Sequence, residues 1–106
     1  MQDHYAAWNK SSHHNVAQCN DCHSPPGGEM EKLYCKGMNG FHHSAAFTLG
    51  THQDQLMITE FNRKITERSC RKCHADVTHG IEVISQAKDE KTSCIRCHRS
   101  VGHPTH

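Results

Sequence analysis

The sequence predicts a mostly α-helical fold with extensive loops, in which short helices are held together by something other than a large hydrophobic core. Hydrophobic residues make up only 34% of the 106 residues, and the mean hydropathy is −0.82. Side-chain burial alone would hardly offset the entropy lost on ordering so polar a chain. No segment alternates as a half-buried strand would. The length favours one domain over residues 1–106.

One cysteine pattern, C-x-x-C-H, occurs three times. It is the attachment signature of c-type haem, in which two thiols form thioethers and the adjacent imidazole binds the iron. The sequence therefore predicts three covalent haem c groups with short helices packed around them. The residues expected to hold the haems are Cys19, Cys22, His23, Cys70, Cys73, His74, Cys94, Cys97 and His98.

Two other kinds of site also use paired cysteines. The four cysteines between Cys70 and Cys97 fit the upper edge of zinc-ribbon spacing, and a lone C-x-x-C can be a redox pair. Neither site needs a histidine directly after the second cysteine, yet one follows in all three motifs. A zinc ribbon would also leave Cys19 and Cys22 without a second pair. Haem is therefore the favoured interpretation.

The spacing of apolar residues between the motifs predicts short helices, at residues 2–14, 29–38, 54–69 and 81–91. The last two lead into Cys70 and Cys94, so a haem should lie at the end of each. The run Ser24-Pro25-Pro26-Gly27-Gly28 should end the first motif. Residues 40–50, bounded by glycines, are expected to form a less polar loop packed against haem faces.

The 12 histidines supply candidates for the second axial ligand of each iron. His79 and His103 each follow their own motif histidine by five residues. That is too close to reach the far side of the same haem, but each could serve a neighbouring haem. His13, just before the first motif, and His43, in the 40–50 loop, are further candidates. The histidines expected to be solvated are His4, His52 and His106.

The remaining features bear on compartment and partners. Cys35, the seventh cysteine, is expected to be a buried free thiol. Haem c is attached after export, so a periplasmic or equivalent extracytoplasmic location is predicted. No apolar run is long enough to span a bilayer, and no basic patch suggests nucleic acid at a net charge of +1.

The order of these motifs resembles the small subunit of cytochrome c nitrite reductase, in the wider family of tetrahaem quinol dehydrogenases. The segments that carry the resemblance are Tyr5–His13, Cys19–His23, Gly40–Thr51 and Ser100–His103. Members of this family take electrons from membrane quinol and pass them to a periplasmic multihaem reductase. The resemblance thus implies an electron-transfer subunit in a hetero-oligomer with a larger multihaem oxidoreductase.

The resemblance also has implications for individual residues. It implies that His13, His43 and His103 are the important histidines outside the motifs, and that a partner subunit can donate a ligand to one iron. The family begins with a transmembrane helix and a first haem in a C-x-x-C-H-x-M motif, and Met1 falls at that methionine. The chain is therefore expected to lack the anchor and to carry three haems. Lys32 matches a lysine near the family's quinol site, whereas Asn39 replaces an aspartate.

The predicted function is electron relay to or from an oxidoreductase of nitrogen metabolism, resembling either pentahaem nitrite reductase or octahaem hydroxylamine oxidoreductase. A non-catalytic subunit is favoured over an enzyme. The alternatives are a small haem enzyme with an open distal site for nitrite or hydroxylamine, a free periplasmic electron shuttle, and a zinc-binding interaction module.

Overall fold

The computed structural model describes residues 2–51, 57–84 and 93–103, and the side chains of 82–84 are not included. All regular structure in these residues is helical, without a strand. The helices are α1 (Gln2–Asn9), α2 (Cys19–His23), α3 (Glu29–Thr48), α4 (Glu60–Cys73), α5 (Ala75–Ile84) and α6 (Cys94–Cys97). The predicted fold class, mostly α with extensive loops, is confirmed.

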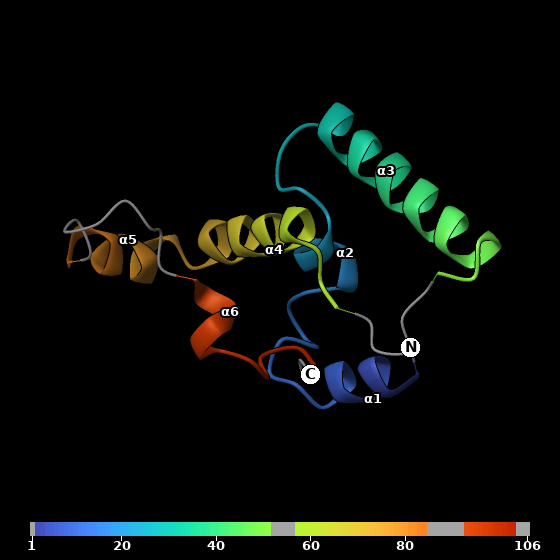
Figure 1. The fold of residues 1–106 in the computed structure, drawn as a ribbon. Coiled ribbons are helices and arrows are strands. Elements are labelled where there is room, and N and C mark those ends of the chain that lie inside the picture. Colours follow the sequence, from blue (N-terminus) through green and yellow to red (C-terminus); the bar gives the residue numbers. More distant parts are fainter. Residues whose placement is uncertain (1, 52–56, 85–92, 104–106) are drawn as a thin grey trace.

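Helix α4 is the central element of the fold. It contacts α2, α5 and α6, while α3 extends away from it and the segment after α6 returns to α1 (Figure 1). The helix begins at Glu60 because Thr59 caps it, its hydroxyl accepting from the Asn62 backbone N–H at 3.3 Å. The predicted helix at 54–69 thus starts later and continues through the second motif; residues 52–56 lie outside the described part.

The prediction of a loop at 40–50 is wrong, because α3 continues from Glu29 to Thr48. Gly40 lies inside the helix, and the actual stop is Gly50. Gly50 has φ 63°, the left-handed conformation that favours glycine. The N–H groups of Gly50 and Thr51 bond to the carbonyls of Phe47 and Ala46 at 3.3 and 3.0 Å, the pattern of a Schellman motif.

Two other predicted helices differ in their bounds. The helix expected at 2–14 ends at Asn9, and turns follow over residues 10–16. There the Trp8 indole N–H donates to the Ala17 carbonyl at 3.1 Å, which ties the turn to α1. The helix expected at 81–91 instead spans Ala75–Ile84 and starts directly after the second motif; residues 85–92 are outside the described part.

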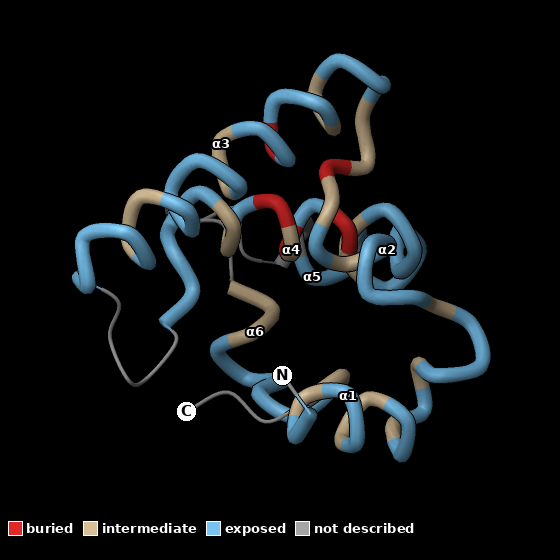
Figure 2. The backbone as a smooth tube through the Cα atoms, turned by 90° about the vertical axis from the view of Figure 1, so that its right-hand side faces the viewer, coloured by how far each residue is buried: buried red, intermediate tan, exposed pale blue. Residues whose placement is uncertain are grey.

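The buried core is small. Cys35 and Ile65 are the buried hydrophobic residues, 2% and 4% exposed, within the described chain. Figure 2 shows the buried positions on α3, on α4 and in the segment after α2 that holds Pro25. The expected burial of the Cys35 thiol is confirmed. Many large hydrophobic side chains are exposed, among them Tyr5, Met30, Leu33, Phe41, Phe47, Met57, Phe61 and Val77.

Long side chains, rather than close helix packing, hold α3 against α4. Two asparagines form a reciprocal amide pair: Asn39 Nδ2 donates to Asn62 Oδ1 at 3.1 Å, and Asn62 Nδ2 donates to Asn39 Oδ1 at 3.0 Å. Arg68 forms an ion pair with Glu31. No helix among the described residues is long and apolar enough to cross a membrane.

Candidate haem sites

The second and third motifs have the same local structure. The Cys70–Cys73 pair ends α4 and the Cys94–Cys97 pair forms α6, and in each case the motif histidine is the C-cap. The backbone N–H of that histidine bonds to the carbonyl of the first cysteine at 2.9 Å in both. The repeat seen in the sequence is therefore also a repeat of backbone conformation, which presents two thiols and an imidazole at one helix end.

The first motif forms α2 and lies against α4. Asp21, within the motif, accepts a hydrogen bond from the Gln18 backbone N–H at 2.8 Å, which helps the short helix begin. Ser24 follows the motif histidine, and its N–H bonds to the Asn20 carbonyl at 3.0 Å. The breaker predicted after the motif is present, because residues 24–28 are not helical.

Thiols from all three motifs share one neighbourhood around α4. Burial, together with the nearby thiols of Cys94 and Cys22, raises the pKa of Cys70 to about 11. Burial also raises the pKa of Cys22, with Asp21 and Cys73 adding to the effect. Each motif thus has a thiol close to a thiol of another motif, so groups attached there would be neighbours.

Two histidine pairs bring a motif histidine beside a histidine from another part of the chain. The rings of His13 and His74 have centroids 6.1 Å apart. Those of His23 and His103 are 5.9 Å apart and nearly parallel. Two imidazoles that bind one metal ion from opposite sides, each nitrogen about 2 Å from it, have centroids roughly 6 Å apart. Both spacings suit one iron between two rings.

A hydrogen bond fixes the orientation of His13. Its Nδ1 lies 3.1 Å from the Val101 carbonyl oxygen, and because a carbonyl can only accept, this nitrogen carries the proton. The Nε2 lone pair is then available to a metal. Such a bond from the second ring nitrogen is typical of metal-binding histidines. Val101 stands two residues before His103, so one short segment serves both pairs.

His4 is a residue that the sequence analysis missed. It was expected to be solvated, but it is half-buried, and its ring lies 4.7 Å from the ring of His103, edge to face. Burial lowers the pKa of His23, with His103 and His4 adding to the effect, which favours the neutral imidazole that binds metals. Its position four residues before Trp8 gave no signal of this contact. His52 and His106 lie outside the described residues.

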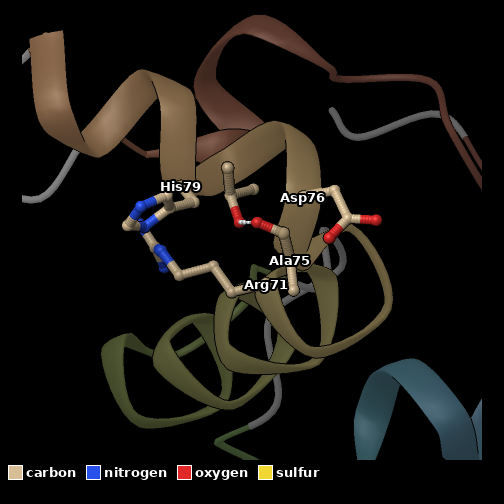
Figure 3. Close-up of a pocket in the computed structure, with 5 residues that line it drawn as sticks. Arg71, Ala75, Asp76 and His79 are labelled. Atoms are coloured by element: carbon tan, nitrogen blue, oxygen red, sulfur yellow. Dashed lines mark hydrogen bonds between the residues drawn. The ribbon is translucent and has the colours of Figure 1, made fainter.

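The other candidate ligands lie apart from these pairs. His43 is exposed on α3, and His98 is exposed after α6. In the described part of the chain, no imidazole faces His98. His79 lines an open pocket of about 590 Å³ with Arg71, Ala75, Asp76 and Thr78. Figure 3 shows the Arg71 and His79 side chains pointing toward one another, whereas Asp76 points away from them.

The described residues fit covalent haem c. All seven cysteines are free thiols, and each motif has one exposed and one half-buried cysteine. Two imidazole pairs have the spacing of axial ligands, and exposed apolar side chains surround a core too small for the chain. Among the described residues, no three His, Cys, Asp or Glu side chains are grouped so that they could hold a single metal ion. This also applies to the four cysteines with zinc-ribbon spacing.

Comparison with known proteins gives a consistent result. No protein-family model matches the chain. Over 97% of its length it is 35% identical to the cytochrome c-type protein NrfH of Wolinella succinogenes, of which it covers 63%. Over 88% of its length it is 32% identical to the cytochrome c nitrite reductase subunit NrfH of Nitratidesulfovibrio vulgaris, of which it covers 55%. The chain thus spans less than two thirds of these curated relatives.

A solved structure matches both the fold and the sequence. It is the crystal structure of the cytochrome c nitrite reductase NrfHA complex bound to the inhibitor HQNO, with a TM-score of 0.71 and 30% identity. The match covers 97% of this chain and 67% of that one. The chain therefore belongs to the NrfH family of c-type cytochromes, and its cofactor is covalent haem c.

Proposed function

We propose that the chain is an electron-transfer subunit with three c-type haems, one at each motif, that exchanges electrons with a larger multihaem oxidoreductase. The observation that carries this proposal is the pair of imidazole contacts, His13 with His74 and His23 with His103, at about the spacing of two ligands on one iron. Haem iron with two imidazole ligands exchanges single electrons and offers no open position to a substrate.

The chain's own residues determine how close the haems lie. Helix α4 carries the second motif and contacts both α2 and α6, which carry the other two. The axial ligands also cross between motifs: His103 follows the third motif but lies beside His23 of the first. A chain folded in this way keeps each haem next to another, as serial electron transfer requires.

The third motif is the proposed contact with the partner. His98 is exposed, and no imidazole in the described segments faces it. Family resemblance implies that a partner donates a ligand to one iron, and the third haem is the candidate. The relatives are named for cytochrome c nitrite reductase, which favours a nitrite-reductase-like partner over a hydroxylamine oxidoreductase. The complex would act in the periplasm or an equivalent compartment.

The exposure of His98, which no imidazole in the described segments faces, supports a second candidate function. A third haem whose opposite face is not filled by a protein ligand could bind nitrite or hydroxylamine, which would make the isolated chain a small haem enzyme. In that case the reduced protein, without a partner, would bind one CO per chain, at one of its three haems. The subunit proposal expects this binding to disappear when the partner is present.

The proposal is tested on protein purified from its native source. A pyridine haemochrome assay should give three haem c groups per chain, and a larger multihaem protein should co-purify. Low-temperature electron paramagnetic resonance should show two low-spin irons with two imidazole ligands each. A chain that carries zinc instead of haem, or that purifies alone as a monomer, would contradict the subunit proposal.

A further inference from the structure

Glu67 is a buried carboxylate to which neither haem attachment nor axial ligation assigns a role. It lies on α4 one turn before Cys70 and is 9% exposed. Burying a carboxylate is unfavourable unless a donor or a cation compensates the lost hydration. Its partners therefore indicate what it does.

The carboxylate of Glu67 connects two motif-bearing helices. Ser93, directly before the third motif, donates its hydroxyl to Glu67 Oε1. The guanidinium of Arg71, inside the second motif, lies 3.8 Å from Glu67 Oε2. One buried side chain thus contacts a neighbour of Cys94 and a residue between Cys70 and Cys73.

The contact with Ser93 replaces an ordinary helix cap. Ser93 is the N-cap of α6, a position where serine hydroxyls usually accept from the helix backbone, but it makes no side-chain capping bond. Its hydroxyl instead donates to Glu67. Because α6 has only four residues, it is too short to be stable alone. Attachment to α4 through Glu67 therefore fixes the position of Cys94.

The charge of Glu67 also lies where it would affect two haems. Haem iron gains positive charge on oxidation, and a nearby anion in a poorly hydrated site stabilises the oxidised form. The Arg71 guanidinium lies 3.8 Å from Glu67 Oε2 and offsets this charge, so neutralising Glu67 alone would leave the arginine cation unbalanced in the second motif. A second acid of the same helix offers a contrast: the Glu60 side chain is 60% exposed, and water and salt screen it.

We propose that Glu67 positions the third haem site relative to the second and that its negative charge lowers the reduction potentials of the haems at these two motifs. The inference rests on the proposed function, because it requires haem at both motifs. Haem content is therefore measured first for every variant. Fewer than three haems in the unmodified protein would overturn the proposed function, whereas three haems with unaltered potentials in the variant would overturn only the role of Glu67.

The charge is tested with Glu67→Gln, which keeps an oxygen that can accept from Ser93. Its matched control is Glu60→Gln, which removes the same charge from the same helix, about 10 Å further than Glu67 from Cys70 along the axis. Spectroelectrochemical titration of the purified holoprotein should show at least one midpoint potential raised in Glu67→Gln and none in Glu60→Gln. Equal potentials in the two variants would overturn the electrostatic role.

The positioning role is tested separately, so that a failure of Glu67→Gln to mature does not leave the proposal undecided. Ser93→Ala removes the hydroxyl that contacts Glu67, and Ser100→Ala removes an exposed hydroxyl on the other side of the third motif. Ser93→Ala should lower the haem content or the thermal midpoint of the holoprotein and should alter its magnetic-resonance spectrum. Ser93→Ala behaving as Ser100→Ala does would overturn the positioning role.

Discussion

The imidazole rings of His23 and His103 lie nearly parallel, with an interplanar angle of 8° and centroids 5.9 Å apart. These residues are 80 positions apart in the sequence. A contact across most of the chain means that the first haem site is complete only when the segment after α6 has returned to α1. If these two histidines bind one iron as proposed, they also tie the two ends of the chain together.

Replacing His103 with alanine should open one face of the haem at the first motif. The expected result is one five-coordinate haem per chain, visible as a high-spin signal and as stoichiometric CO binding by the reduced protein beyond that of the unmodified protein. His42→Ala provides the control, because His42 is exposed on α3. If His103→Ala and His42→Ala bind the same amount of CO, His103 is not an axial ligand.

Replacing His13 with methionine should raise the midpoint potential of the haem at the second motif. Methionine opposite histidine favours reduced iron more than a second imidazole does, and the variant also loses the bond to the Val101 carbonyl. A potentiometric titration followed in the visible region measures the change. His14→Met is the control, since His14 packs 4.7 Å from the ring of Trp8 instead of near a motif histidine. If the two variants give the same titration curve, His13 is not an axial ligand of the haem at the second motif.

Some of this arrangement could be predicted from the sequence, and some could not. The motifs identify the attachment residues because haem attachment demands a fixed local spacing, and local spacing is visible in the sequence. The proposed axial ligands depend on long-range contacts such as that of His23 with His103, which local periodicity in the sequence cannot reveal. His4 was missed for the same reason: its neighbour, His103, comes from the other end of the chain.

The incorrect prediction of a loop at residues 40–50 has a different cause. Gly40 and Gly50 look alike in the sequence, and the sequence predicts a loop boundary at each. Only Gly50 adopts a positive φ, while Gly40 lies within α3. A glycine weakens a helix by only about 1 kcal/mol, so its presence alone does not predict where a helix ends.

Acid should weaken the contact between α3 and α4. The hydrogen bond from Arg68 lowers the pKa of Glu31 below its ordinary value of 4.5. A carboxyl with a lowered pKa in the folded state stabilises the fold above its unfolded pKa, and this stabilisation is lost as the pH falls below 4.5 through the folded value. The effect should be small because both side chains are substantially exposed.

Glu31→Gln should therefore reduce the dependence of the thermal midpoint on pH between about pH 5 and pH 3. Glu29→Gln is a useful comparison, because the pKa of Glu29 is also lowered, but by Lys32 of the same helix. Thermal melts of the two holoprotein variants across this range measure both effects. Only Glu31→Gln should also weaken the attachment of α3 to α4. A larger decrease of the thermal midpoint at neutral pH in Glu29→Gln would therefore contradict the role of Glu31 in this attachment.

Replacing Asn39 with aspartate, the residue that the family resemblance implies at this position, should destabilise the protein. In this chain the Asn39 amide donates to Asn62 Oδ1 and, at 3.4 Å, to the buried Cys35 sulfur. Aspartate has no N–H to donate, so its carboxylate would face the Asn62 oxygen and the thiol. The expected loss is about 1–3 kcal/mol in the free energy of unfolding.

Chemical denaturation of the holoprotein, followed by circular dichroism, measures the loss caused by Asn39→Asp. Asn15→Asp makes the same chemical change at an exposed position and should leave the stability within about 0.5 kcal/mol of the unmodified protein. A double variant with Asn62→Asp should be less stable still, because two carboxylates would then meet between α3 and α4. If instead Asn39→Asp is as stable as Asn15→Asp, the amide pair does not hold these helices together, and the ion pair between Glu31 and Arg68 must provide most of the attachment.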